Sequence, residues 1–363
     1  METLRVGFIG TGDVKEGFGN PEGFFMAYFH HRAYARLPNI EFAACADLVR
    51  ERAEKFASFS GTKAVYTDYR EMLHKEKLDL VSICTWPDVH TEMVVSAAEA
   101  GVKGIHCEKP MSATWSGVKK MLEVAKARGS RLTINHQRRY GDPFVKVYDV
   151  LKSGELGTLQ RIEGACPNLW DWGDHFGDLF HKYVDEAPAE WAMGQIDYRT
   201  GDKWFGMPVE DQGLFQIRYQ NGVDGFIFTA QDCWKRAPLL RLLCTNGVIE
   251  RRYEQPNVRW RLNGARDWEA AETEDRLVEV NVHGKKVAFW EDNAFEKCFA
   301  DMVDSLRTGR DCQIKAENAI RGQEDVYACY ESVRRRSKVT LPIDIEDHPF
   351  LDLVQRGVLG KKA

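Results

Sequence analysis

Residues 80–110 read LVSICTWPDVHTEMVVSAAEAGVKGIHCEKP, and this stretch contains the pattern that decides the fold. Its first five residues are apolar or small and predict a buried strand, and the residues up to Gly101 predict a helix that this glycine ends. Gly104–Cys107 predicts a second buried strand, with Lys109 just beyond its carboxyl end. In an open parallel sheet, ligands bind beyond the carboxyl ends of the strands. The stretch therefore predicts a β-α-β unit that presents Lys109 and Trp86 to a ligand.

The size and charge of the whole chain limit the class of protein. The chain has 363 residues, which suggests about two domains at roughly 150 residues each. Hydrophobic residues make up 44% of the chain and charged residues 29%, as in an ordinary globular protein. The net charge of −5 and the isoelectric point near 6.1 argue against a polyanionic partner. We therefore expect neither nucleic acid nor a membrane as the partner.

Cysteine usage and the N-terminus indicate the compartment. The nine cysteines form no C-x-x-C motif, and Cys45, Cys84, Cys107 and Cys244 lie in apolar, strand-like surroundings. Such cysteines are typical of buried thiols in a reducing compartment. The chain begins with a predicted strand rather than a signal peptide, and no apolar run reaches about 18 residues. We therefore expect a cytoplasmic protein.

A glycine-rich turn follows the first predicted strand, at Gly10-Thr11-Gly12. This is the start of the dinucleotide fingerprint G-x-G-x-x-G/A, in which glycines let the backbone approach a pyrophosphate. The third small residue is delayed by residues 13–25, which we interpret as an insertion in the phosphate loop, with Ala27 in place of the third glycine. A glycine-rich turn without a ligand is the alternative interpretation.

The second predicted strand, Glu41–Ala46, ends at Asp47. An acidic residue at this position suits the ribose hydroxyls of NAD, whereas the 2′-phosphate of NADP would be repelled. The nearby Arg50 and Arg52 keep NADP open as an alternative.

Two domains follow from the periodicity of the chain. Six predicted strands alternate with helices up to Asn135, so residues 1–136 predict a doubly wound parallel sheet that binds a dinucleotide. From Gly157 onward, short strands with turns at Asn221-Gly222 and Asn246-Gly247 predict an antiparallel sheet. Residues 137–363 therefore predict an α+β domain with a large, mainly antiparallel sheet, which binds substrate.

Six short motifs occur together in an order and spacing that is typical of one known family. They are Gly10-Thr11-Gly12, Asp47, Thr85-Trp86-Pro87 with His90, Glu108-Lys109-Pro110, Arg138-Arg139-Tyr140, and Asp171-Trp172-Gly173-Asp174-His175 with Asp178. On these residues the chain resembles the Gfo/Idh/MocA family, named for glucose–fructose oxidoreductase and inositol 2-dehydrogenase, over nearly its whole length.

The resemblance implies an NAD(P)-dependent oxidoreductase of a sugar or cyclic polyol. Members of the family pair a Rossmann domain with an antiparallel sheet that often mediates oligomers, so it implies a homodimer or homotetramer and a cis peptide before Pro110. It implies NAD as the cofactor, with NADP not excluded. The implied cofactor-binding residues are Gly10, Thr11, Gly12, Ala27, Asp47, Thr85, Trp86, His90, Glu108 and Lys109, and the implied substrate-binding residues are Lys109, Arg138, Arg139, Tyr140, Asp171 and His175.

The family match also implies that Lys109, Asp171 and His175 form the catalytic set. Oxidation of an alcohol needs a base, and histidine has a pKa suited to that role. Asp171 and His175 are four residues apart, so on a helix they share one face, where the carboxylate orients the imidazole. The alternatives are a capping aspartate with a surface histidine, a Lys109–Glu108 ion pair, and packing of Trp86 at the domain junction.

The three residues at the predicted domain junction have two interpretations as well. Arg138, Arg139 and Tyr140 could contact substrate hydroxyls, or the two arginines could pair with carboxylates. We expect no metal site, although Asp178 and His181 continue the face that starts at Asp171. Two other functions stay open: NAD-assisted glycoside cleavage by transient oxidation and elimination, and a non-catalytic NAD-binding sensor.

Overall fold

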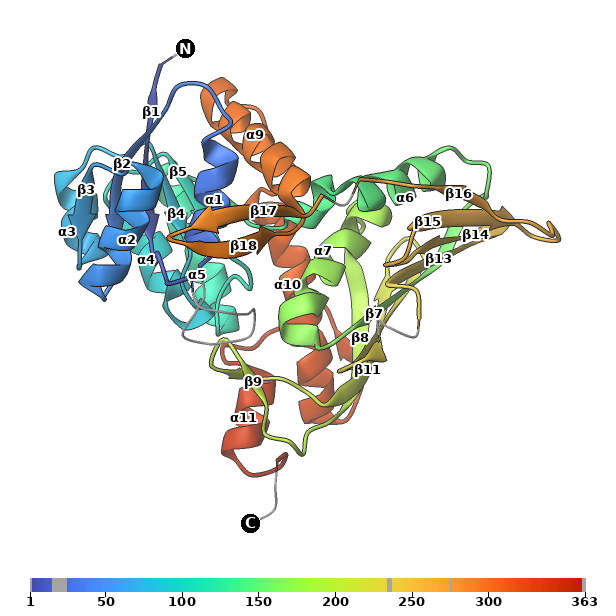
Figure 1. Cartoon of the computed structure of the whole chain (residues 1–363). Coiled ribbons are helices and arrows are strands. Elements are labelled where there is room, and N and C mark those ends of the chain that lie inside the picture. Colours follow the sequence, from blue (N-terminus) through green and yellow to red (C-terminus); the bar gives the residue numbers. More distant parts are fainter. Residues whose placement is uncertain (1, 15–24, 234–236, 275, 361–363) are drawn as a thin grey trace. The chain divides into compact units, whose positions relative to one another are not determined.

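The structure, a computed structural model of the chain, describes residues 2–14, 25–233, 237–274 and 276–360 (Figure 1). Contacts among these residues divide the chain into two compact units. The first unit consists of Met1–Ser112, Gly117–Gln137 and Asp275–Glu317, and the second of Ala113–Ser116, Arg138–Glu274 and Asn318–Ala363.

A six-stranded sheet forms the centre of the first unit. Its strands are β1 (Leu4–Ile9), β2 (Ile40–Ala46), β3 (Ala64–Tyr66), β4 (Leu80–Ile83), β5 (Gly104–Cys107) and β6 (Arg131–Ile134). They lie in the order β3-β2-β1-β4-β5-β6, and every neighbouring pair is parallel. Strands β4 and β5 are buried along their whole length, as expected where helices cover both faces of a parallel sheet. This is the predicted doubly wound sheet, and its strand order reverses between β1 and β4.

Five helices connect these strands. They are α1 (Met26–Tyr34), α2 (Arg50–Ser60), α3 (Tyr69–Lys75), α4 (Pro87–Glu99) and α5 (Trp115–Arg128). Helix α4 begins at Pro87, whose missing N–H costs nothing in a first turn. Gly101 follows its end with a φ of 83°, a left-handed conformation that glycine adopts without strain. The local signals of residues 80–110 therefore predicted this β4-α4-β5 segment correctly.

A later segment of the chain also belongs to the first unit. It contains the hairpin of β17 (Val278–Val282) and β18 (Lys285–Phe289) and the helix α9 (Asp292–Thr308). The ring centroids of Phe29 and Phe289 lie 4.5 Å apart, and Asp292 pairs with Arg32 at 2.8 Å and with Arg36 at 2.6 Å. The sequence placed this segment in the second domain because its position along the chain gives no sign of these contacts with α1.

The second unit is built on a nine-stranded sheet. Its strands are β7 (Leu159–Cys166), β8 (Ala189–Asp197), β11 (Gln212–Tyr219), β12 (Asp224–Ala230), β13 (Leu240–Cys244), β14 (Gly247–Arg251), β15 (Val258–Leu262), β16 (Glu269–Ala271) and β19 (Val339–Thr340). The order is β16-β15-β14-β13-β7-β12-β11-β8-β19, and β7 with β12 is the one parallel pair of this described sheet. The mainly antiparallel sheet is confirmed, as are the two hairpins predicted from Asn-Gly turns. A short pair, β9 (Lys203–Trp204) and β10 (Met207–Pro208), lies apart from it.

Helices cover one face of this sheet. They are α6 (Asp142–Lys152), α7 (Asp174–Tyr183) and α10 (Ala316–Arg335), and a further helix, α11 (Pro349–Gln355), follows near the C-terminus. Glycine allows α7 to lie close to the sheet: a Cβ on Gly164 of β7 would lie 3.1 Å from the ring of Phe176 in α7. Where α7 crosses α10, a Cβ on Gly177 would lie 2.8 Å from the carbonyl oxygen of Gly322. Backbone atoms cannot give way there, so both helices need glycine at the crossing.

The opposite face of the sheet carries exposed apolar side chains. Met193, Leu214 and Phe228 are 46%, 49% and 41% exposed. They come from the neighbouring strands β8, β11 and β12 and point away from the helices, because side chains alternate along a strand.

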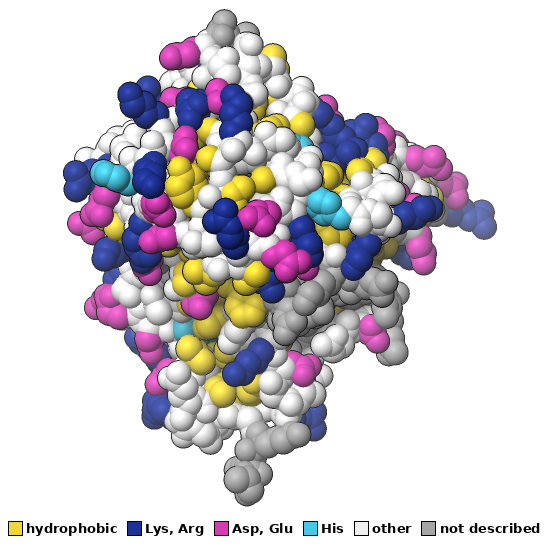
Figure 2. All heavy atoms as spheres, turned by 60° about the vertical axis from the view of Figure 1, so that its left-hand side comes forward, with side chains coloured by type: hydrophobic (Ala, Val, Ile, Leu, Met, Phe, Trp, Pro, Cys, Tyr) yellow, Lys and Arg dark blue, Asp and Glu magenta, His cyan; other side chains and the backbone are white. Residues whose placement is uncertain are grey.

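Side chains of both charge signs are interspersed over the face shown in Figure 2, in line with the small net charge. In the part of the chain that the structure describes, every helix is too short or too polar to span a membrane.

Candidate active site

The glycine-rich turn lies at the carboxyl end of β1. Gly10 and Gly12 have φ angles of 80° and 66°, in the left-handed region that favours glycine. A Cβ on Gly10 would lie 2.5 Å from the side chain of Thr85 and 3.0 Å from the carbonyl oxygen of Cys84, so a larger residue does not fit. The turn is therefore packed against the end of β4, at the point where the strand order reverses.

Asp47, at the end of β2, is bound to this turn. One of its carboxylate oxygens accepts the backbone N–H groups of Thr11 and Gly12, both at 3.0 Å, and the Thr11 hydroxyl at 3.2 Å. The other oxygen accepts the N–H of Val49 at 2.9 Å. The turn therefore presents convergent N–H donors that already hold an anionic oxygen. Such a donor set, beside a carboxylate that can accept ribose hydroxyls, fits a dinucleotide.

The third small residue predicted for this fingerprint is Ala27, in the first turn of α1, and it is completely buried. Most of the predicted insertion, residues 15–24, lies outside the described residues. Contacts between the cofactor phosphates and this part of the loop therefore stay a prediction.

Three further predicted cofactor residues lie where β4 leads into α4. Thr85 and Trp86 are half-buried, and Trp86 immediately precedes the helix. His90 is completely buried, and its two ring nitrogens face backbone carbonyls. Nε2 lies 3.1 Å from the Thr85 oxygen and Nδ1 lies 3.0 Å from the Pro110 oxygen. Burial lowers the pKa of His90. This histidine therefore links the loop after β4 to the loop after β5.

The Glu108-Lys109-Pro110 triplet follows β5. The Lys109–Pro110 peptide is cis, as the family resemblance implied. Lys109 is half-buried, whereas Glu108 is only 1% exposed. One Glu108 carboxylate oxygen lies 2.8 Å from Nε2 of His30 and accepts Nδ2 of Asn135 at 2.7 Å. The other accepts the backbone N–H of Lys109 at 3.2 Å.

The surroundings of Glu108 favour its ionised form. Burial alone would raise the pKa of this carboxyl group, but the hydrogen bond and charge of His30, the charge of Lys109 and the hydrogen bond of Asn135 together lower it. Glu108 is therefore a carboxylate at neutral pH. Its oxygens are occupied by protein groups, and the predicted contact of Glu108 and of His90 with the cofactor stays a prediction.

In the second unit, the D-x-G-x-H motif spans a change of helix type. Residues Leu169–Gly173 form a π-helical turn in which the N–H of Gly173 bonds to the Asn168 carbonyl at 3.0 Å, and α7 continues directly from it. Asp171 lies in the π turn and His175 in the first turn of α7, so they do not share one regular helix as the sequence suggested. π turns are frequent at functional sites. Asp171 and His175 are 5% and 4% exposed.

Two buried side chains hold the start of this turn. Asn168 caps it, and its side-chain oxygen accepts the N–H of Asp171 at 2.7 Å. Glu210 accepts the N–H of Leu169 at 2.6 Å with one oxygen and the hydroxyl of Tyr330 at 2.8 Å with the other. Burial raises the pKa of Glu210. The turn that carries Asp171 is thus fixed from within the second unit.

The predicted substrate-binding arginines have different surroundings. Arg138 is 8% exposed, and its guanidinium lies 4.5 Å from the centre of the Trp172 ring. Arg139 donates to Asp178 and to Glu186, both at 2.7 Å. Burial would lower the pKa of Arg139, but the charges of these two carboxylates raise it instead. Of the two interpretations, carboxylate pairing describes Arg139, whereas the contact of Arg138 is with an aromatic ring.

Tyr140 ends the short 3-10 helix Gln137–Tyr140 and is 7% exposed. The residues that could extend the Asp171 face into a metal site are occupied otherwise: Asp178 pairs with Arg139, and Nε2 of His181 lies 3.0 Å from the Asp325 carboxylate. Among the described residues, no group of three His, Cys, Asp or Glu side chains is arranged to hold a metal ion.

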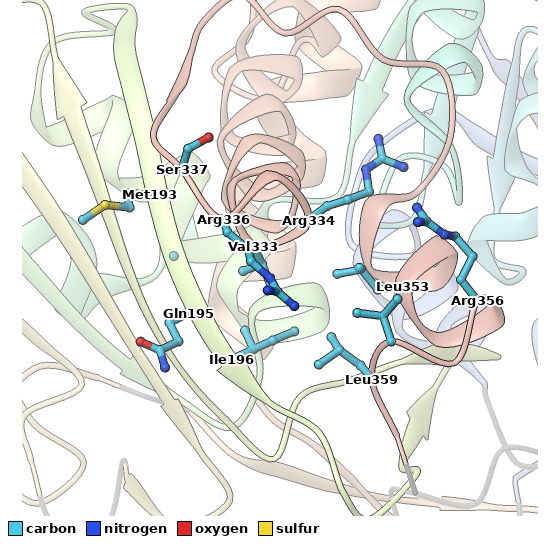
Figure 3. A pocket seen from close by; sticks show the side chains of 12 residues that line it. Met193, Gln195, Ile196, Val333, Arg334, Arg336, Ser337, Leu353, Arg356 and Leu359 are labelled. Carbon is cyan, nitrogen blue, oxygen red and sulfur yellow. The ribbon is translucent and has the colours of Figure 1, made fainter. Parts of the chain in front are cut away.

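A cavity of about 630 Å³ lies elsewhere in the second unit (Figure 3). Its lining includes Arg334, Arg336 and Arg356 and none of the predicted site residues. Arg334 already pairs with Asp347 at 2.5 Å, and Arg356 pairs with Asp352 at 3.2 Å. Two of the three lining arginines are therefore already paired with carboxylates.

The parallel sheet, the glycine turn and the aspartate after β2 define the class of the first unit: a dinucleotide-binding doubly wound domain. Residues 4–136 match the model of the family described as "Oxidoreductase family, NAD-binding Rossmann fold". Residues 4–136 are therefore similar to the NAD-binding Rossmann domain of the Gfo/Idh/MocA oxidoreductases, as the motifs suggested for this part of the chain.

Individual relatives match over part of their length. The oxidoreductase YrbE of Bacillus subtilis is 31% identical over 140 residues, which cover 38% of this chain and 41% of that protein. Inositol 2-dehydrogenase of Salmonella typhimurium is 26% identical over 209 residues, which cover 56% of this chain and 58% of the enzyme. The chain thus spans only about half the length of these curated relatives.

Solved structures match over nearly the whole chain. Levoglucosan dehydrogenase in complex with NADH superposes with a TM-score of 0.78 at 19% identity, covering 94% of this chain and 100% of that one. An oxidoreductase from Agrobacterium radiobacter, in complex with NAD⁺, L-tartaric acid and magnesium, gives 0.75 at 18% identity, covering 93% and 98%. At this identity the likeness is one of fold, and it extends to both units.

Proposed function

We propose that this protein is an NAD-dependent dehydrogenase that oxidises a hydroxyl group of a sugar, sugar derivative or cyclic polyol, or reduces the corresponding ketone. One observation carries the proposal. The convergent N–H donors of the glycine turn, the Asp47 carboxylate and Lys109 all follow strand ends of a sheet whose residues match the NAD-binding family. Ligands of such sheets bind at the strand ends.

The proposed chemistry assigns a role to each residue of the catalytic set. NAD bound at the glycine turn and Asp47 would supply the hydride acceptor for the carbon that carries the hydroxyl. His175 takes the hydroxyl proton, so the alcohol loses one hydride and one proton and becomes a ketone. Lys109 donates a hydrogen bond to the reacting oxygen, and Asp171 orients the imidazole. In the reverse direction His175 returns the proton.

Arg138 is the proposed substrate contact among the three junction residues. Its guanidinium lies against the Trp172 ring, and an indole face together with a fixed donor suits the apolar face and the hydroxyls of a sugar. Arg139 is instead proposed to support the site, because its donors are directed at Asp178 and Glu186.

The experiment that tests the proposal is a screen of sugars and cyclic polyols with NAD and with NADP, read at the absorbance of the reduced nicotinamide. A dehydrogenase forms NADH in step with a keto product. An enzyme that cleaves glycosides by transient oxidation releases the aglycone without net NADH, and a sensor binds NAD and does neither. Glycosides of each active sugar therefore belong in the same screen.

A further inference from the structure

The buried polar network around His30 extends through the core of the first unit. His30 is completely buried in α1, and its Nδ1 lies 3.2 Å from the hydroxyl of Ser82 and 3.4 Å from the thiol of Cys84. The hydroxyl of Tyr34 lies 2.9 Å from the same Ser82 oxygen. On its other side, Nε2 of His30 contacts Glu108. The network therefore runs from Tyr34 to the residue directly before Lys109.

The Glu108 carboxylate is buried, and burying a charge is costly unless it is paired and hydrogen-bonded. The two oxygens of Glu108 have separate partners. One is held by His30 and Asn135, and the other accepts the N–H of Lys109. The carboxylate thus joins the rigid core to the backbone from which the Lys109 side chain begins, and its charge lies near the ammonium group.

The following peptide is held as well. The carbonyl oxygens of Pro110 and Met111 lie 3.0 Å and 3.3 Å from Nδ1 of His90, which is itself buried. The backbone of Lys109 is therefore fixed before and after its own position.

We propose that Glu108, held by His30 and Asn135, is a positioning residue for Lys109: it fixes the lysine backbone and supplies the negative charge beside the ammonium group. The inference deepens the proposed dehydrogenase function and rests on the role of Lys109 in it. It gives Glu108 a role other than the cofactor contact that the motif suggested.

The first test is the isosteric variant Glu108→Gln. It keeps the shape of the side chain and removes the charge. We expect the folded variant to bind NAD within a few-fold of wild type, with kcat per NAD-binding site lower by on the order of 10²-fold and substrate KM little changed. Counting only NAD-binding sites removes the effect of unfolded protein. A variant with wild-type kcat per site would overturn the proposal.

The double variant His30→Gln/Glu108→Gln separates positioning from stability. It replaces the imidazole–carboxylate pair by two amides that can still form hydrogen bonds. We expect its thermal stability to recover part of the loss seen in the single Glu108 variant, while kcat per site stays low. If kcat recovered together with stability, Glu108 would be a structural residue only, and the proposal would be wrong.

Tyr34→Phe is the matched control at the far end of the same network. It removes a buried hydroxyl that contacts Ser82. The groups that contact Glu108 stay in place. We expect lower stability with kcat per site within about twofold of wild type. An equal loss of kcat in Tyr34→Phe and Glu108→Gln would show that any damage to the network slows the enzyme, which contradicts a specific role for Glu108.

A last experiment tests the role of Glu108 without measuring dehydrogenase activity. The rate at which an amine-reactive anhydride acylates Lys109, measured by mass spectrometry of the holoprotein, should rise in Glu108→Gln, because the side chain of Lys109 is then no longer held by a neighbouring negative charge. Equal rates in wild type and variant contradict the proposal. If wild type oxidises no sugar or polyol, the proposed function fails, and this arm still decides the role of Glu108.

Discussion

Lys109 and His175 come from different parts of the chain, and both are embedded in surroundings that restrict their movement. Lys109 follows a carboxylate anchored in the core of the first unit, and His175 begins a helix that continues from a π turn. Rigid support of this kind is what a catalytic group needs, because small misplacements cost much of the rate.

Removing either group should separate chemistry from cofactor binding. We expect His175→Ala and Lys109→Met to stay folded and to bind NAD within a few-fold of wild type, since the glycine turn and Asp47 are untouched. Loss of a positioned acid or base lowers the rate by about 10²–10⁴-fold, and Asp171→Asn should also be slow. Full dehydrogenase activity in His175→Ala would show that the D-x-G-x-H motif is structural.

Asp47 should set the preference for NAD over NADP, because a 2′-phosphate would meet its carboxylate. Replacing Asp47 by Ser keeps a hydrogen-bonding oxygen near the turn and removes the charge, so the ratio of the two affinities should move towards one. Titration calorimetry with each cofactor measures it. Tighter binding of NADP by wild type would contradict this assignment and would implicate Arg50 or Arg52.

The acid stability of the first unit should depend on Glu108. The pKa of Glu108 in the folded protein lies below its ordinary value of 4.5, so its contribution is full above that pH and is lost as the pH falls through the folded pKa. The difference in unfolding free energy between wild type and Glu108→Gln should therefore be largest near about pH 7 and shrink in acid. Denaturant titrations at several pH values measure this difference. A gap that widens below pH 4.5 would show that Glu108 is protonated in the fold.

At the scale of single elements, the sequence predicted a helix, strand or turn correctly where the residues that determine it lie within that element. The two Asn-Gly turns correctly predicted the hairpins β11–β12 and β13–β14. Strand β8 was not predicted, because its polar residues and Gly194 give no clear alternation and its extended state depends on pairing with β11 and β19. The β17–β18 hairpin was also not predicted, although Val278–Val282 alternates apolar and polar residues.

The site residues divide in the same way. Those that carry a motif could be proposed from the sequence, whereas the supporting residues His30, Asn135 and Glu210 could not. They act through contacts between distant positions: His30 and Glu108 are 78 residues apart, and Glu210 and Leu169 are 41 apart. No spacing rule predicts such pairs. Likewise, the four-residue spacing of Asp171 and His175 suggested a regular helix and did not predict the π turn.

The π turn gives a prediction of its own. Asn168 accepts the N–H of Asp171, so Asn168→Ala should loosen the turn, with a stability loss of about 1 kcal/mol and a lower kcat. Asn168→Ser keeps an acceptor at the cap and should restore most of both. Thermal unfolding and steady-state kinetics on the two variants check this. Equal behaviour of the Ala and Ser variants would mean that the cap does not hold Asp171.

At the scale of the whole molecule, the exposed face of the nine-stranded sheet is the feature that a single chain leaves unexplained. Met193, Leu214 and Phe228 lie on three neighbouring strands of that face. Burying such a patch against a second copy would be favourable, and the two copies would then form a symmetric pair.

We therefore expect a homodimer or homotetramer. Light scattering should give a mass of at least twice 41.6 kDa at micromolar concentration. Leu214→Lys should lower that mass while leaving NAD affinity unchanged, because the substitution lies in the second unit and leaves the glycine turn and Asp47 of the first unit as they are. A wild-type protein found only at 41.6 kDa would rule out this assembly.

The central claim is that the chain transfers a hydride between NAD and a sugar or polyol hydroxyl. Its most direct test measures NADH and keto product together, from purified wild-type protein supplied with NAD and each member of a panel of sugars and cyclic polyols. The account predicts that at least one compound gives the two products in equal amounts, and that Lys109→Met and His175→Ala form neither at a comparable rate. Saturable NAD binding with no NADH from any compound, or aglycone release from a glycoside without net NADH, would contradict it.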